Sequence, residues 1–296
     1  MFEVLKRFCK IGEIEHDKDV PRYLKIMEQL RENLNHYAWD GAWYQRAYFE
    51  NGTAIGTHES EECKIDSISQ SWAVISGAGD VEKGNIAMEN LENHLVDREN
   101  MMIKLLTPAF HRTELNPGYI KSYIPGVREN GGQYTHGAVW AILASAKIRN
   151  GQKAMEYFHF LNPIEHAATK ERAVKYKVEP YVVVADIYAS PQMIGRGGWT
   201  WYTGSSSWLF CAGLEGILGI QKEGDALKLN PCIPSDWESF SVSFQFEDTS
   251  YQINVYQQDS FQHQIFTIYQ DNNLVTTNQI HLINDKMEHR IDVIMG

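Results

Sequence analysis

The chain has 296 residues, of which 38 are acidic and 27 are basic, so its formal net charge at pH 7 is −11. This acidic balance, without any cluster of Lys and Arg, argues against a nucleic-acid partner. No stretch approaches the roughly 20 apolar residues of a membrane-spanning helix, and the N-terminal residues lack the apolar core of a signal peptide. The four cysteines have no CxxC spacing, which argues against a zinc site and predicts reduced thiols in a cytoplasmic protein.

Apolar residues recur at helical spacing as far as residue 221. In the segment 22–39 one apolar stripe is formed by Leu24, Met27, Leu30, Leu34 and Tyr37. Further helices are predicted at 67–79, 80–96, 135–151, 152–162 and 205–220. We expect Asp80 to cap the third of these six helices and Asn150-Gly151 to end the fourth.

The loops between the predicted helices are long, aromatic and rich in glycine, as in 39–60 and 188–204. Loops of that length inside a compact domain are usually functional or disordered. These contain too many aromatic residues for disorder. We therefore expect a mostly α protein, in which a toroid of helices carries loops that build a cleft at one end.

The period of the pattern changes to two after Gly224. Val242, Phe244 and Phe246 alternate with polar residues before a turn at Asp248-Thr249. A second alternating segment surrounds the turn signal 271–273. The sequence therefore predicts a helical domain over 1–221 and a small β-rich domain over 222–296.

One polar stretch, "RENGGQYTHGAVW" at 128–140, surrounds the pair Gly131-Gly132 just before a predicted helix. Glycines allow the backbone to approach a ligand closely, and a helix N-terminus favours an anion. Arg128 and Gln133 would add hydrogen bonds, and His136 would lie in the first turn, which Thr135 could cap. We interpret the stretch as a small-anion pocket beside a polar cleft; the alternative is a capped helix with a structural histidine.

The stretch "GRGGWTWYTGSSSWLF" at 195–210 has the same character. Thr203, Gly204 and the serines at 205–207 precede a helix, which indicates a second anion-ready position, although such residues are also common helix caps. Trp199 and Trp201 would offer aromatic platforms for a sugar ring. An anion beside aromatic platforms is what a ligand made of sugar and phosphate requires.

Several carboxylates are candidates for binding sugar hydroxyls. They are Glu129, Glu179 and Asp186. Asp40 lies between two tryptophans, either as an acid in a sugar cleft or as an Asp-Gly turn flanked by buried aromatics. The stretch "HESEEC" at 58–63 fits no metal-ligand spacing, and no metal site is expected.

Four segments resemble glycoside hydrolase family 94: "WDGAWYQRAYFENGTAIGTHESEECKIDSISQSWAVISGA", "NPGYIKSYIPGVRENGGQYTHGAVWA", "KVEPYVVVADIY" and "GRGGWTWYTGSSSW". The likeness is greatest to the C-terminal, phosphorylase-type domain of cyclic β-1,2-glucan synthases and to 1,2-β-oligoglucan phosphorylases. It runs to about Trp237 and weakens in the β-rich tail. The resemblance implies an (α/α)6 barrel followed by a small β domain.

The resemblance also implies inverting phosphorolysis of a β-glucoside, with inorganic phosphate as co-substrate and no other cofactor. In this family a His and a Thr-Gly pair hold the phosphate, and these fall on His136, Thr203 and Gly204. A family Glu that contacts the sugar falls on Glu129. The partners implied are a β-glucan oligosaccharide and phosphate.

One departure limits the likeness. The family's general acid is the Asp of a "DWND" segment upstream of "WDG", and this chain contains no such segment. We expect the acid to lie before residue 1, so that this chain alone is inactive and needs a missing N-terminal half or a homo-oligomer to complete its site. The alternative is a non-catalytic β-glucan- or phosphate-binding remnant.

Overall fold

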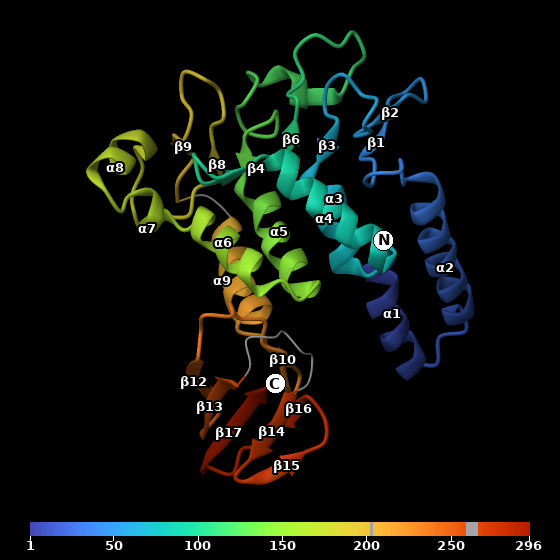
Figure 1. Ribbon diagram of the computed structural model, residues 1–296. Helices are drawn as coiled ribbons and strands as arrows, with labels where there is room; N and C mark the ends of the chain where they lie inside the picture. Colours follow the sequence, from blue (N-terminus) through green and yellow to red (C-terminus); the bar gives the residue numbers. More distant parts are fainter. Residues whose placement is uncertain (202–203, 259–265) are drawn as a thin grey trace.

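A computed structural model describes residues 1–201, 204–258 and 266–296. The helices in these ranges all lie at or before Ile217, and the longer strands follow them (Figure 1). The α-helices are α1 Phe2–Ile14, α2 Val20–Tyr37, α3 Ser67–Ser76, α4 Val81–Leu95, α5 Thr135–Lys147, α6 Gly151–Leu161, α7 Pro163–His166, α8 Lys170–Tyr176 and α9 Ser205–Cys211. A 3-10 turn, η1 Gly118–Ser122, lies between α4 and α5, and a π-helical turn, η2 Ala212–Ile217, extends α9.

Helix boundaries follow the local capping residues. Asp66 begins α3 by accepting hydrogen bonds from the backbone N–H groups of Ile68 and Ser69, and Gly77 ends it with a φ of +72°. Asp80 caps α4 through Glu82 and Lys83, as predicted from the sequence. Side-chain oxygens satisfy N–H groups that a helix start leaves free, and glycine adopts the left-handed backbone at little cost.

Helix α5 is the centre of the helical part. It packs against α3, α6, α9 and η2, and most of its side chains are buried. The sequence prediction of its start was right, but its cap was predicted wrongly. Tyr134 is the N-cap and makes no side-chain capping bond, while Thr135 is the first helical residue and is buried.

The apolar stripe predicted on α2 is only partly covered by the residues that the structure describes: Met27, Leu30 and Leu34 are half-buried, and the two ends of the stripe are exposed. Leu24 is 39% exposed and Tyr37 is 67% exposed, and Val20 is the buried residue of this helix. Helix α1 also presents apolar side chains to solvent, namely Val4, Phe8, Ile11 and Ile14. Both helices lie at one side of the molecule, coloured blue in Figure 1.

The long loops contain short strands that hold them in place. Each of these strands has two residues: β1 Ala47–Tyr48, β2 Ala54–Ile55, β3 Ile65–Asp66, β4 Val96–Asp97, β5 Met102–Ile103, β6 Leu106–Thr107, β7 Gln133–Tyr134, β8 Asp186–Ile187 and β9 Gly197–Gly198. The pairs are β1 with β2, β3 with β6 and β4 with β5, while β8 lies between β7 and β9. Most of these loops lie together at the end of the molecule opposite the C-terminal sheets (Figure 1).

The C-terminal part is built from two sheets. One has the order β12-β13-β17-β14-β15, with strands Ser239–Phe246, Thr249–Gln257, Glu288–Met295, Phe266–Gln270 and Asn273–Val275. The other has the order β10-β11-β16, with strands Ile220–Glu223, Ala226–Leu229 and Gln279–His281. Alternate residues of the central strands, such as Ile253 and Val293, are fully buried.

The predicted order of helices followed by a β-rich C-terminal region is confirmed. The expectation of a mostly α protein was too narrow, because the chain is mixed: long strands fill its last quarter and short strands tie its loops. Within the described ranges, no helix is both long and apolar enough to cross a membrane.

Candidate functional site

A cavity of about 250 Å³ opens at the start of α5. Its lining residues are Arg128, Tyr134, His136, Ala185, Trp199, Gly204 and Ser205. The structure therefore brings together three residues that the sequence had predicted for one site: Arg128 and His136 from the segment that leads into α5, and Gly204 from the start of α9. Thr203, also predicted for this site, lies outside the described residues.

The short sheet β7-β8-β9 forms one wall of the site. Its antiparallel register sets Asp186 directly opposite Tyr134 on one side and opposite Gly198 on the other. Residues that face each other across a sheet share one of its faces. The carboxyl group of Asp186 is therefore on the same face as Tyr134, which lines the cavity. A Cβ added to Gly198 would lie 2.8 Å from Oδ1 of Asp186, so only glycine leaves room for this carboxyl.

His136 is the second residue of α5. Its ring centroid lies 4.9 Å from that of Trp140 and 5.5 Å from that of Trp208. Burial lowers the pKa of His136, which favours the neutral imidazole. A neutral imidazole offers one N–H donor and one acceptor, and the uncapped start of α5 adds the positive end of a helix dipole. This end of the cavity is suited to an anion.

Arg128 lies between two aromatic rings. Its guanidinium carbon is 5.6 Å from the centroid of Tyr123 and 5.2 Å from that of Trp199. Nε of Arg128 is buried and has no hydrogen-bond partner among the described residues. A guanidinium held between rings keeps its donors in a fixed direction, which suits recognition of a carboxylate or phosphate.

Two carboxyl groups near Arg128 also lack partners in the described part of the chain. Both oxygens of Asp186 and Oε2 of Glu129 are buried without a hydrogen bond of good geometry. Burial raises the pKa of Asp186 to about 6; the charge and the backbone N–H of Arg128 oppose this shift, and the charge of Glu129 adds to it. Buried carboxyl oxygens without donors are costly, and such groups concentrate in binding and catalytic sites.

The glycine pair has a role within the protein. Gly131 has a φ of +86°, and a Cβ there would lie 2.9 Å from Cβ of Ala109. A Cβ on Gly132 would lie 3.0 Å from backbone atoms of Arg128 and Gly126. The close approach that we had expected toward a ligand is thus made to the chain's own atoms, in the loop from which Arg128 lines the cavity.

The remaining predicted contacts lie outside the cavity lining. Gln133 is fully buried, and its side-chain oxygen accepts a hydrogen bond of 2.9 Å from the backbone N–H of Ile103. Its amide group is used inside the protein, so a substrate contact by Gln133 stays an untested prediction. Trp201 is 70% exposed and donates from Nε1 to Glu179 at 3.0 Å. These two residues form an exposed pair beyond Trp199.

Asp40 and Glu62 hold loops together. Asp40 accepts hydrogen bonds from the backbone N–H groups of Ala42, Trp43 and His58, which is the Asp-Gly turn of the two alternatives considered. Glu62 accepts three backbone bonds from residues 111–113. In the described ranges no group of three or more His, Cys, Asp or Glu side chains could hold a metal ion.

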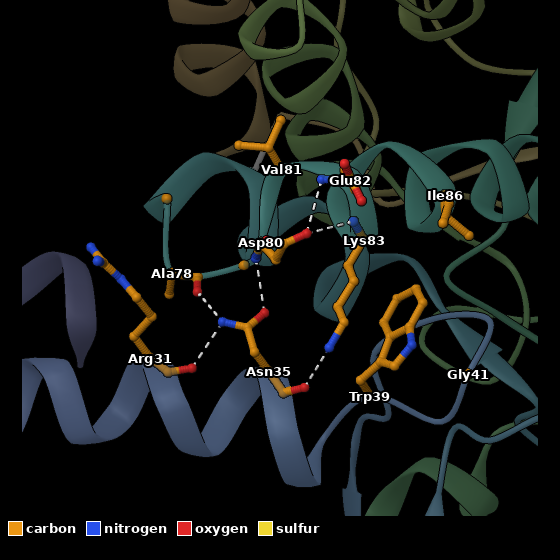
Figure 2. Close-up of a pocket in the computed structure, with 12 residues that line it drawn as sticks. Arg31, Asn35, Trp39, Gly41, Ala78, Asp80, Val81, Glu82, Lys83 and Ile86 are labelled. Carbon is orange, nitrogen blue, oxygen red and sulfur yellow. Dashed lines mark hydrogen bonds between the residues drawn. The ribbon is translucent and has the colours of Figure 1, made fainter.

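A larger hollow, of about 810 Å³, lies between α2 and the turn before α4 (Figure 2). Its polar groups are bonded to one another. The side chain of Asn35 donates to the carbonyl groups of Arg31 and Ala78 and accepts from the backbone N–H of Asp80, while Lys83 donates to the carbonyl of Asn35 (Figure 2). This hollow is an internally satisfied helix junction, so the cavity at α5 is the stronger candidate site.

Trp140 and Trp208, which enclose His136, were not predicted as site residues. Trp140 follows His136 by four positions on one helix, so helical geometry could have identified it. Trp208 reaches His136 from α9, and only the packing of α5 against α9 brings the two rings together.

Comparison with known proteins gives a family and several relatives for this chain. Residues 1–219 match the family described as the glycosyl hydrolase 94 superfamily, catalytic domain. The chain is 46% identical over 264 residues to a cyclic β-(1,2)-glucan synthase of Rhizobium meliloti, which covers 88% of this chain. It is 33% identical over 258 residues to an N,N′-diacetylchitobiose phosphorylase of Vibrio proteolyticus, covering 86% of this chain, and 26% identical over 286 residues to a solabiose phosphorylase of Paenibacillus borealis, covering 96%.

These relatives are much longer proteins. The chain spans 9% of the length of the Rhizobium protein, 32% of the Vibrio protein and 36% of the Paenibacillus protein.

Proposed function

Because the chain belongs to the glycosyl hydrolase 94 superfamily, we propose that it is part of a catalytic domain that transfers a β-glucosyl group between a sugar and inorganic phosphate. The phosphate is the nucleophile and attacks the anomeric carbon with inversion. A general acid protonates the leaving oxygen, so one protein carboxyl suffices where an inverting hydrolase also needs a base. Inorganic phosphate is the only co-substrate of this proposal.

We assign the phosphate to the cavity at the start of α5. The observation that carries the proposal is the convergence there of Arg128 and His136, from the segment that leads into α5, with Gly204, from the start of α9. In the proposed complex the imidazole N–H and the guanidinium donate to phosphate oxygens, and the backbone at Gly204 completes the site. Charge-assisted donors in a partly enclosed cavity are the usual means of holding an oxyanion.

We assign the sugar to the side of the cavity bounded by Glu129 and the tryptophans. Trp199 lines the cavity and is 56% exposed, which leaves aromatic surface for a pyranose ring. Trp201 and Glu179, hydrogen-bonded to each other further out, are proposed to contact the next sugar unit. The 46% identity to a cyclic β-(1,2)-glucan synthase favours a β-1,2-linked glucan as this substrate.

We propose that the general acid comes from protein outside this chain and that the helices complete an (α/α)6 barrel with that protein. Asp40 and Glu62, two acids in the family-like segments, already accept three backbone hydrogen bonds each. The uncovered apolar side chains of α1 and α2 support the need for further helices. The small fraction of each relative that the chain spans agrees with this proposal.

The test is phosphate release from α-glucose 1-phosphate with sophorose or glucose as acceptor. We expect no release from the purified, folded chain and recovery when the remainder of a family 94 catalytic domain is supplied. Turnover by the chain alone would contradict the proposal that the acid lies elsewhere. Failure of the complemented protein to release phosphate, with fold and assembly verified, would reject the assigned reaction.

A second candidate function, sugar or phosphate binding without catalysis, is favoured by one observation. The cavity, lined by the polar side chains of Arg128, Tyr134, His136 and Ser205, forms within this chain alone. Calorimetric titration with inorganic phosphate and with sophorose distinguishes the two, because a binding protein retains both affinities and shows no turnover in any assembly.

A further inference from the structure

The carboxyl group of Asp186 is the most isolated buried charge near the cavity. The residue is 0% exposed, and neither of its oxygens has a hydrogen bond of good geometry among the described residues; the backbone N–H of Arg128 is a nearby donor. Oε2 of Glu129 is buried and unpartnered in the same region. Asp186 and Glu129 thus present buried oxygens whose capacity to accept hydrogen bonds is largely unused.

The chemistry of these oxygens restricts what they bind. They accept hydrogen bonds, whereas phosphate at neutral pH is rich in acceptor oxygens and poor in donors. A sugar ring carries several hydroxyl groups, each of which donates one hydrogen bond. Acceptors at Asp186 and Glu129 therefore complement hydroxyl groups, while the donors of His136 and Arg128 complement an anion.

The sheet register aims Asp186 toward the site. Asp186 lies opposite Tyr134, a cavity-lining residue, and opposite Gly198, whose missing side chain leaves space beside Oδ1. Trp199, the residue after Gly198, also lines the cavity. The charged and titratable groups around Asp186 are Arg128, Glu129 and Tyr188.

We infer that Asp186 is a sugar-binding, specificity-determining residue whose carboxylate accepts hydrogen bonds from hydroxyl groups of the glycosyl unit, with Glu129 as its neighbour. The inference rests on the proposed function, since it assumes that a sugar lies beside the anion end of the cavity. It divides the site into an acceptor end for the sugar and a donor end for phosphate. Hydrogen-bond acceptors then bind the sugar, and hydrogen-bond donors bind the phosphate.

The first experiment measures binding of glucose and of its 2-, 3-, 4- and 6-deoxy analogues to the full chain by NMR titration. We expect at least one deoxy analogue to bind about 10-fold more weakly than glucose to the unaltered chain. In Asp186→Asn, glucose affinity should fall to that level, and the difference between glucose and that analogue should disappear. The matched control is Asp236→Asn, which changes an exposed carboxyl to an amide and should bind like the unaltered chain.

Inorganic phosphate, titrated into the same samples, separates failure of this inference from failure of the proposed function. Unchanged phosphate affinity with lost glucose discrimination supports the role of Asp186. Unchanged glucose affinity and discrimination in Asp186→Asn overturns it, even where phosphate binds. Absence of both glucose and phosphate binding by the folded, unaltered chain overturns the proposed function and the inference with it.

A measurement on the unaltered chain covers the case in which Asp186→Asn does not fold. Hydroxyl donors stabilise the carboxylate form, so glucose binding near pH 6 should release a fraction of a proton. Calorimetry in two buffers of different ionisation enthalpy measures that release. Proton uptake, or no change, would overturn the assignment of the hydroxyl contact to an ionised Asp186.

Discussion

The imidazole of His136 and the indole of Trp140 lie one turn apart on α5, with ring centroids 4.9 Å apart and an interplanar angle of 55°. Trp208 of α9 approaches the same imidazole at 5.5 Å and contacts Trp140 edge-on at 6.0 Å. His136 is thus enclosed by two large apolar rings while its position also lines the cavity. These two rings account for the burial that lowers the pKa of His136.

Replacing Trp208 by Ala should raise the pKa of His136 toward its ordinary value. The substitution admits water beside the imidazole and reduces the cost of its charged form. An NMR titration of the His136 ring protons measures the change, and Phe210→Ala, which removes an exposed aromatic of the same helix, is the control. A pKa that stays the same in Trp208→Ala would show that Trp208 does not desolvate His136.

Replacing His136 by Ala should weaken phosphate binding more than glucose binding. Loss of a charge-assisted hydrogen bond costs on the order of 1.5–3 kcal/mol, which corresponds to about a 10- to 100-fold loss of phosphate affinity. Calorimetry with each ligand gives the two affinities. His111→Ala, an exposed histidine outside the cavity, should leave both unchanged. If the His136 variant bound phosphate as tightly as the unaltered chain, His136 would not be a phosphate-binding residue.

Replacing Asp186 by Asn should stabilise the folded chain at neutral pH. Burial raises the pKa of Asp186 from its ordinary 3.8 to about 6, so its ionised form is costly in the folded state. The cost is absent below pH 3.8, grows as pH rises from 3.8 to about 6, and is complete above about 6, where it reaches about 3 kcal/mol. Asn carries no charge and avoids this cost.

Urea unfolding of both proteins at several pH values tests that prediction. The gain in unfolding free energy of Asp186→Asn should be largest at pH 7 and should shrink toward pH 4. The variant is compared with the unaltered chain at each pH, so the contributions of other carboxylates to the unfolding free energy cancel in the difference. A difference that does not depend on pH would show that Asp186 is not a destabilised buried carboxylate.

Replacing Asn35 by Ala should destabilise the chain by about 1–3 kcal/mol. The Asn35 side chain joins α2 to the turn before α4 through bonds to Ala78 and Asp80 (Figure 2). It also accepts a hydrogen bond of 2.7 Å from the hydroxyl of Tyr44. Tyr44 is 1% exposed and would keep one weaker partner. Thermal unfolding checks the loss, and Asn33→Ala on the solvent face of α2 serves as the comparison.

Local sequence was enough for many boundaries. Asp80 caps α4 because an Asp side chain reaches the N–H groups two and three residues ahead. The turn at Asp271-Asn272 joins β14 to β15 because both residues adopt positive φ, which Asp and Asn tolerate. Such features depend on neighbours a few residues apart, and a pattern along the chain contains all of them.

Residues 128–140 illustrate the limit of this approach. Their polar character and the helix after them were visible in the sequence, as was the likeness of four segments to family 94, which the match over residues 1–219 confirms. The sequence did not show which group each of these side chains contacts. Gln133 bonds to the backbone of Ile103, and Arg128 lies between Tyr123 and Trp199.

The sequence by itself determined the order of the helical and β-rich parts, the cap of α4, the turn at Asp271-Asn272 and the family, because these rest on local backbone preference and on long contiguous motifs. Only the tertiary structure decided which polar groups share a cavity and which are used up inside the protein. Asp186 of β8 pairs with Tyr134 of β7, two strands of two residues each, and Trp208 of α9 contacts His136 of α5. Contacts between residues more than 50 positions apart depend on packing and register, and no local pattern encodes them.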